Sequence, residues 1–331
     1  LSNTTGTNNT ACGRQALDAN TTASNNTAIG YEALSANTTG AQNVAVGANA
    51  LDANTTAGNL TAVGYNALSA NTTGTENTGL GRQALLNNTT GGFNVAVGVN
   101  ALYQNTTANN NTAVGTSALG ANTTGAQNTG IGKNALVQNT TGIQNTALGF
   151  EALYTPTTAN NNTGVGYRSL YANTSGTANS AFGADSLKSN TTGQQNTAIG
   201  QEALRDNTTA IFCTAVGKSA LQDNETGDNN TAVGALALDA NTTGSNHTVV
   251  GRSAATTNTT GSSLTAVGYT ALENNSTGSN STAIGQSALQ ANTTGDNNTA
   301  VGLNSAATNT TGDNNVSMGV NCFRLNTTGG N

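Results

Sequence analysis

The sequence has very little of the material from which most globular proteins and enzymes are built. Of its 331 residues only 7% are charged and 4% are aromatic, and it contains no tryptophan, one proline, one methionine and one histidine. So few large apolar side chains cannot close a thick globular core. So few His, Asp, Glu, Lys and Arg residues leave little for acid–base or nucleophilic chemistry. We therefore expect neither an enzyme nor a bound cofactor.

Charge, hydropathy and cysteine usage exclude further classes. A net charge of -6 repels phosphate, so nucleic acid is not an expected partner. No run of eighteen apolar residues is present, so no membrane span is expected. Cys12, Cys213 and Cys322 are an odd number of cysteines separated by long intervals, which favours buried free thiols over a disulfide. His247 has no second ligand nearby, so no metal site is expected.

What the sequence does have is a strict internal repeat. Nineteen of its 41 glycines recur every seventeen residues from Gly13 to Gly319, without insertion or deletion. Each unit reads approximately Asn-Thr-Ala-Val-Gly-x-x-Ala-Leu-x-x-Asn-Thr-Thr-Gly-x-x. We call these nineteen residues the glycine column. Such a fixed period indicates a repeat protein rather than a disordered low-complexity chain.

Two further positions of the repeat are consistently apolar. The residue before each glycine, from Cys12 to Met318, is apolar in all nineteen units and forms the apolar column. The residue four after each glycine is Leu in sixteen units and forms the leucine column. Charged residues fall at other positions of the repeat. We expect the apolar and leucine columns to face inward and the charged positions to face water.

The repeat predicts an all-β fold, a parallel β-solenoid or β-roll of about nineteen 17-residue rungs. Seventeen residues are too few for a helix pair, and Gly, Asn and Thr are weak helix formers. Runs such as 27–29, bounded by Gly and Asn turns, predict strands of three to five residues. Rungs about 4.8 Å apart would give a rod of roughly 90 Å. Residues 1–331 are expected to be one continuous array, and because they begin and end within a repeat, a segment of a longer fibre.

Individual columns carry conformational predictions. No residue replaces Gly in the glycine column, which predicts a positive φ or a contact too close for a Cβ. A second glycine column lies seven residues before the first. Ala replaces Gly there five times, which predicts that this position needs a small side chain rather than a left-handed backbone.

The turn asparagines, at 3 and every seventeenth residue to 326, are replaced once, by Pro156, which favours an exposed corner. The second asparagines, four before each glycine, are predicted to form an inward ladder because their substitutes suit a semi-buried site. Those substitutes include Leu60, Cys213, His247 and Leu264.

The turn asparagines also begin the glycosylation motif Asn-x-Ser/Thr. Asn and Thr are good turn residues that duplication would copy in any case, but the motif survives changes of its middle residue to Glu225 and Ser276. We therefore predict N-glycans along the corner. The predicted acceptors are Asn3, Asn20, Asn37, Asn54, Asn71, Asn88, Asn105, Asn122, Asn139, Asn173, Asn190, Asn207, Asn224, Asn241, Asn258, Asn275, Asn292, Asn309 and Asn326. The motif recurs at another edge, at Asn8, Asn25, Asn59, Asn110, Asn161, Asn229, Asn246, Asn280 and Asn297.

Two smaller features complete the candidate sites. Phe150 and Tyr167 share one column on adjacent rungs, and Tyr154 and Tyr171 share another, which predicts an exposed aromatic patch. Stacking between rungs explains such a patch, and so does contact with a surface carbohydrate, a receptor or a neighbouring fibre. Aspartates before Asn pairs are interpreted as solvated turn residues rather than calcium ligands. They are Asp228, Asp296 and Asp313.

The runs Asn-Thr-Ala-Ile-Gly-Tyr-Glu-Ala-Leu at 26–34 and Asn-Val-Ala-Val-Gly-Ala-Asn-Ala-Leu at 43–51 carry a resemblance. They resemble the head repeats of trimeric autotransporter adhesins of the YadA type and the repetitive shafts of tail-fibre-domain proteins. The resemblance covers essentially the whole chain. It implies a left-handed parallel β-roll, a homotrimer and display outside the cell for adhesion.

These observations together predict an extracellular or cell-surface structural fibre or adhesin shaft. We expect self-association as a homotrimer or an end-to-end filament, covalent glycans, and contact with a surface carbohydrate or receptor. Two alternatives stay open. Threonine ladders on a flat solenoid face suit an ice-binding protein, and the repeat also suits a phage-type tail-fibre shaft for receptor binding.

Overall fold

In a computed structural model, residues 2–329 are described, and their regular secondary structure consists of nineteen three-residue β-strands with no helix. Each strand ends on a residue of the apolar column, immediately before the glycine. The strands are β1 (Thr10–Cys12), β2 (Thr27–Ile29), β3 (Val44–Val46), β4 (Thr61–Val63), β5 (Thr78–Leu80), β6 (Val95–Val97), β7 (Thr112–Val114), β8 (Thr129–Ile131), β9 (Thr146–Leu148), β10 (Thr163–Val165), β11 (Ser180–Phe182), β12 (Thr197–Ile199), β13 (Thr214–Val216), β14 (Thr231–Val233), β15 (Thr248–Val250), β16 (Thr265–Val267), β17 (Thr282–Ile284), β18 (Thr299–Val301) and β19 (Val316–Met318).

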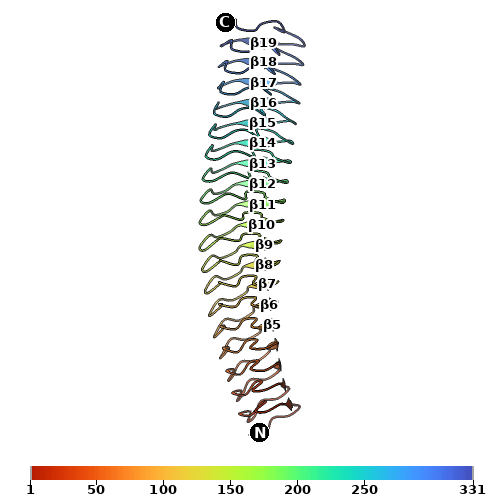
Figure 1. Cartoon of the computed structure of the whole chain (residues 1–331), viewed down its shortest axis with the longest axis vertical. Coiled ribbons are helices and arrows are strands. Elements are labelled where there is room, and N and C mark those ends of the chain that lie inside the picture. The colour runs from red at the N-terminus through yellow and green to blue at the C-terminus, as the bar shows by residue number, and fades with distance from the viewer. Residues whose placement is uncertain (1, 330–331) are drawn as a thin grey trace. The chain divides into compact units, whose positions relative to one another are not determined.

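The chain divides into two compact units of the same architecture, Leu1–Asn162 with β1–β9 and Thr163–Asn331 with β10–β19. Within each unit every strand pairs in parallel with the next, in a register of seventeen residues, so that Thr27 lies beside Val44 in the first unit and Thr197 lies beside Thr214 in the second. Figure 1 shows the strands of each unit one above another on successive rungs. The predicted parallel β-solenoid with 17-residue rungs is confirmed.

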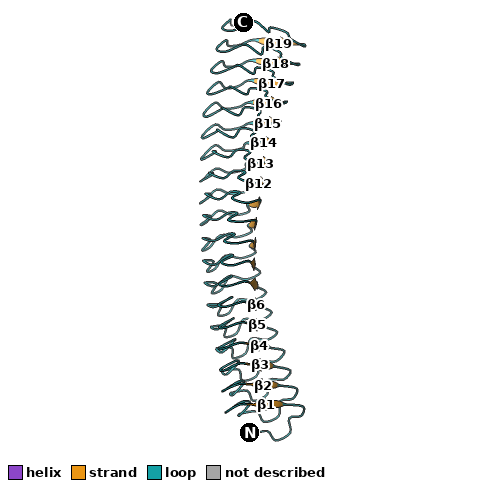
Figure 2. Cartoon of the chain, turned by 45° about the vertical axis from the view of Figure 1, so that its right-hand side comes forward, coloured by secondary structure: helices purple, strands orange, loops and turns teal. Residues whose placement is uncertain are grey.

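Most of each rung is turn rather than strand, as Figure 2 shows. The chain closes a rung with left-handed backbone at three positions that are not glycine, for example Asn25 (φ 62), Glu32 (φ 53) and Leu34 (φ 54). Left-handed backbone is disfavoured for such residues by about 1–2 kcal/mol. Leucine is nevertheless kept, because full burial of its side chain contributes about 1.5–3 kcal/mol, and Leu34 is fully buried. The predicted inward orientation of the leucine column is confirmed.

The glycine column has both of the predicted reasons for admitting no other residue. Gly30 has a φ of +138°, and a Cβ added to it would lie 2.5 Å from the carbonyl oxygen of Gly47 on the next rung. Glycines of the second column lie outside the left-handed region at every described position, and Ala takes their place at Ala57 and four other rungs. The second glycine column therefore requires a small residue rather than a left-handed backbone, as predicted.

The apolar column does not face inward, contrary to the sequence prediction. In β2 the central Ala28 is fully buried, whereas Ile29 is 41% exposed. Phe182 and Leu148 are exposed to a similar degree. The reason is the alternation of side chains along a strand, which sends the central residue of a three-residue strand inward and its two neighbours outward. The narrow interior is filled instead by alanine, leucine and asparagine.

Replacement of Gly200 by Ala should destabilise the protein more than replacement of Gly193, its neighbour in the second glycine column. Gly200 has a φ of +134°, whereas Gly193 lies outside the left-handed region; a Cβ added to either would lie 2.5 Å from a carbonyl oxygen of the next rung, so the backbone conformation makes the difference. The left-handed strain alone is worth about 1–3 kcal/mol. The free energy of unfolding, measured by denaturant titration, checks this. Equal losses for Gly200→Ala and Gly193→Ala would contradict the argument.

Candidate functional site

The turn asparagines form a buried hydrogen-bond ladder, not an exposed corner, and the sequence prediction was wrong on this point. Asn37 is fully buried, and its Nδ2 donates to Oδ1 of Asn20 on the preceding rung (3.2 Å) and to the carbonyl oxygen of Gly40 (2.9 Å). The same pair of bonds repeats along each unit. Both amide hydrogens are thus used inside the rung, one along the stack and one to close the turn. Only the terminal Asn3 and Asn326 are not fully buried.

The second asparagines form the inward ladder that the sequence predicted. Asn26 donates from Nδ2 to the carbonyl oxygen of Gly40 (2.9 Å), and its Oδ1 accepts the backbone N–H of Asn43 (2.9 Å). The oxygen of Gly40 therefore accepts two carboxamide N–H groups, from Asn26 and Asn37. Residues that replace these asparagines are at most 1% exposed. They are Leu60, Cys213, His247, Leu264 and Ser281.

Pro156 interrupts the ladder of turn asparagines in the first unit. Pro156 is itself buried, and it supplies no amide group. Oδ1 of Asn139, one rung earlier, is consequently buried without a hydrogen-bond partner. The single proline, which suggested an exposed corner from the sequence, is instead a defect in a buried network.

The burial of the turn asparagines bears directly on the predicted glycans. A glycan on Nδ2 of Asn37 would remove one of the two N–H donors of the ladder and would need space inside the rung. The asparagines of the other motif set, such as Asn25 and Asn59, are exposed at left-handed turn positions. The signal that separates the two sets is present in the sequence: the turn column keeps Asn at every position except Pro156, whereas the exposed edge also holds Gln, Phe, Glu, Ala and Ser.

The first and third residues of each strand form an uncharged surface that we call the outer strand face. In β2 these residues are Thr27 and Ile29, and in β3 they are Val44 and Val46. Parallel pairing places the first residues of successive strands in one row and the third residues in another. Each unit thus presents a row of mainly threonine beside a row of valine, isoleucine and other apolar side chains.

The predicted aromatic patch is distributed over the two units. Phe150 and Tyr154 lie in the first unit, and Tyr167 and Tyr171 lie in the second. The guanidinium carbon of Arg168 lies 5.1 Å from the ring centre of Tyr167 and 5.4 Å from that of Tyr171, within the range of cation–π attraction. Sequence reasoning missed this arginine, although its place between the two tyrosines in the chain was the available signal.

The buried titratable side chains have environments that suppress their charge. Burial lowers the pKa of His247 to about 4, and its Nδ1 accepts the backbone N–H of Leu264 (3.2 Å). Burial raises the pKa of the Cys213 thiol to about 11, so this thiol is a poor nucleophile at neutral pH. Cys12 is exposed and Cys322 half-buried, so the prediction of buried thiols holds for Cys213 alone. In residues 2–329 no three His, Cys, Asp or Glu side chains gather as a metal site would require.

The aspartates that precede Asn pairs bind backbone rather than point freely into solvent. Oδ1 of Asp228 accepts the N–H of Ile211 (2.8 Å), and Oδ1 of Asp296 accepts that of Ser279 (2.7 Å). Oδ1 of Asp313 accepts the N–H of Asp296 (2.8 Å). Each carboxylate therefore links one rung to the preceding one.

Comparisons with known proteins place the chain in no family. It matches no protein-family model and no curated protein at a significant level. In the part of the chain that the structure describes, no helix has the length and apolar character needed to cross a membrane.

Pro156→Asn should give a more stable protein than Pro156→Ala. The new carboxamide can donate to the unpartnered Oδ1 of Asn139, and satisfying a buried acceptor is worth about 1–3 kcal/mol. The alanine variant controls for the loss of the proline ring, which itself changes the entropy of the unfolded chain. Denaturant titration of both variants measures the difference. An asparagine variant no more stable than the alanine variant would rule out an energetic role for the ladder.

The contribution of Asp239 to stability should fall between about pH 4 and about pH 7, while that of buried His247, whose pKa is lowered to about 4, rises over the same range. Burial, with the nearby charge of Asp223, raises the pKa of Asp239 to about 6, and its Oδ1 is buried without a partner. The folded state therefore binds this proton more tightly than the unfolded chain, whose aspartate pKa is about 3.9. The contribution of Asp239 to stability is greatest below that value and declines as pH rises through about 6.

Asp239→Asn removes this contribution, so the thermal midpoint of the variant should rise relative to that of the parent protein as pH increases from about 4 to about 7. Glu76→Gln removes the same charge from an exposed turn and serves as the control. If Asp239→Asn keeps the pH slope of the parent protein, as Glu76→Gln should, the raised pKa of Asp239 does not contribute to stability.

Proposed function

We propose that the chain is part of an extracellular structural fibre, in which it serves as a stiff shaft. The observation that carries this proposal is the constant 17-residue register of backbone and asparagine ladders within each unit. Every rung is bonded to its neighbours along the stacking direction, which is the direction in which a shaft bears load. Charged residues are few and scattered over the turns, which suits a scaffold better than a reaction site.

The outer strand face is the surface through which copies of the shaft would associate. It carries one half-exposed apolar side chain per rung, such as Ile29 and Val63, and no charged residue. Burying the exposed part of each such side chain contributes about 1 kcal/mol, and the contribution repeats on every rung. This favours side-by-side association, including the homotrimer that the resemblance to adhesin heads implies.

Glycans on such a fibre would sit on the exposed asparagines rather than on the turn asparagines. The accessible acceptors are Asn8, Asn25, Asn59, Asn110, Asn161, Asn229, Asn246, Asn280 and Asn297, all exposed. Intact mass before and after amidase treatment, followed by glycopeptide mapping, tests both sets. Occupied turn asparagines in folded protein would contradict the buried ladder, and an unmodified mass would remove glycans from the proposal.

Ice binding is a second candidate, favoured by the rows of the outer strand face. Thr27 and Ile29, with one residue between them, both point outward. The pattern repeats about every 4.8 Å on successive strands. A flat, regularly spaced and uncharged array of this kind can order water. Thermal hysteresis of the purified protein distinguishes this function from that of a fibre, whose assembly would cover the same face.

Replacing three apolar residues of the outer strand face should weaken self-association without unfolding the shaft. In the variant Ile29→Gln, Val46→Gln and Val63→Gln, three partly exposed side chains become polar. Loss of about 1 kcal/mol at each corresponds to a dissociation constant raised on the order of a hundredfold. Sedimentation velocity over a concentration series measures the change.

The matched control places the same three glutamines on another face. Thr22, Thr39 and Thr56 are exposed residues of the Asn-Thr-Thr turn on the same rungs. Their replacement by Gln should leave the association constant unchanged. Equal weakening by both triple variants, or by neither, would exclude the outer strand face as the interface.

A further inference from the structure

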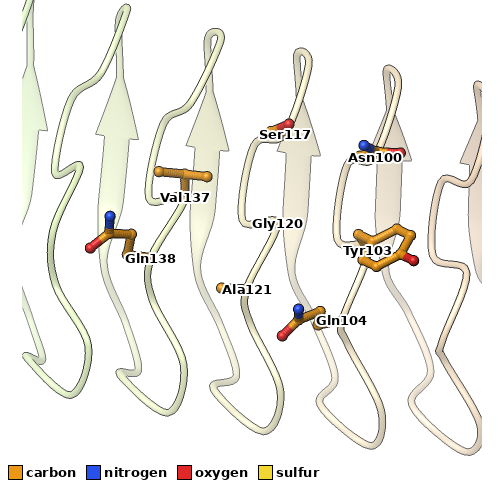
Figure 3. Close-up of a pocket in the computed structure, with 8 residues that line it drawn as sticks. All are labelled: Asn100, Tyr103, Gln104, Ser117, Gly120, Ala121, Val137 and Gln138. Atoms are coloured by element: carbon orange, nitrogen blue, oxygen red, sulfur yellow. The ribbon is translucent and has the colours of Figure 1, made fainter.

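One rung of the first unit lacks a side chain at a position where every other rung has one. Gly120 follows the leucine column, and the residues at the same position one rung before and after are Tyr103 and Val137. Gly occurs at this position on no other rung. The missing side chain leaves a notch of about 290 Å³. Figure 3 shows Gly120 and Ala121 between the rung that carries Tyr103 and the rung that carries Val137.

The rim of the notch carries polar groups that the protein does not use. Four lining side chains make no hydrogen bond with any described residue. They are Asn100, Gln104, Ser117 and Gln138. In Figure 3, Gln104 and Gln138 stand on either side of the Gly120 rung.

We propose that this notch binds one neutral pyranose ring of a carbohydrate. A pyranose has an apolar face of C–H groups that can stack on the ring of Tyr103, and hydroxyls around its edge that both donate and accept. Carboxamides and a serine hydroxyl also donate and accept, so they can pair with such hydroxyls without a fixed charge. The volume lies at the lower end of ligand pockets, which suits a single ring. The proposal does not depend on the fibre function.

The chemistry of the lining separates a sugar from other small ligands. No charged side chain lines the notch, so a carboxylate, phosphate or ammonium ligand would find no counter-charge. A purely apolar ligand would cover the carboxamides of Gln104 and Gln138 and leave them unpaired, at a cost in binding free energy. A neutral polyhydroxylated ring avoids both penalties.

Binding is tested by NMR titration and saturation transfer with the methyl glycosides of glucose, galactose, mannose and N-acetylglucosamine. We expect at least one of them to bind with a dissociation constant on the order of millimolar, as fits a small ligand in an open site. Gly120→Val, which copies the residue of the next rung, should abolish binding by filling the notch. Tyr103→Ala should weaken it about tenfold through loss of the aromatic surface.

The controls separate loss of the site from loss of the fold. Ala307→Val makes a comparable enlargement at the same position of a rung in the second unit and should leave binding intact. Thermal midpoints of Gly120→Val and Tyr103→Ala should stay close to that of the parent protein. The proposal is overturned if none of the four glycosides binds, if binding survives in both notch variants, or if phenol binds as tightly as the best glycoside.

Discussion

The structure depends on the carbonyl oxygen of the second glycine column, which accepts two asparagine amides on every regular rung. Asn26 and Asn37 converge on the oxygen of Gly40, and Asn43 and Asn54 converge on that of Ala57. The interior of a 17-residue rung is too narrow for two layers of large apolar side chains. Carboxamides fill it while satisfying the backbone groups that its tight turns would otherwise leave unpaired.

This dependence explains why the strand can turn its larger apolar residue outward. Between the strand and the opposite turns there is room for Ala28, Ala33 and Leu34, which are fully buried. The cohesion that a thick core would supply comes instead from bonds between rungs, which strengthen one another in a low-dielectric interior. A single rung is not stable by itself, so the stability of the protein comes from the stacking of rungs and is lowest at the ends of the stack.

The period, the absence of helix and the parallel register were predictable, because a strict repeat of seventeen residues with Gly and Asn turns admits few other folds. The direction of individual side chains was less predictable. A residue of the apolar column, such as Ile29 or Val63, would be buried in a large protein but belongs to a half-exposed row in a thin one. Pro156 led to the opposite error, a buried column predicted to be exposed. A proline can replace a buried asparagine there, although Oδ1 of Asn139 is then left without a hydrogen-bond partner. The glycan prediction was made for these turn asparagines, nearly all of which the structure shows to be fully buried.

Positions of the repeat therefore divide into those that the ladder constrains and those that it leaves free. Constrained positions show the same residue on almost every rung. Their side chains serve the hydrogen bonds and packing inside the stack. The free positions vary, and only there can one rung differ from another without breaking the stack. Arg168 between two tyrosines and the notch at Gly120 both arise at free positions. In a protein whose scaffold repeats, recognition of any particular ligand has to come from such departures, because a feature present on every rung cannot mark one place along the fibre.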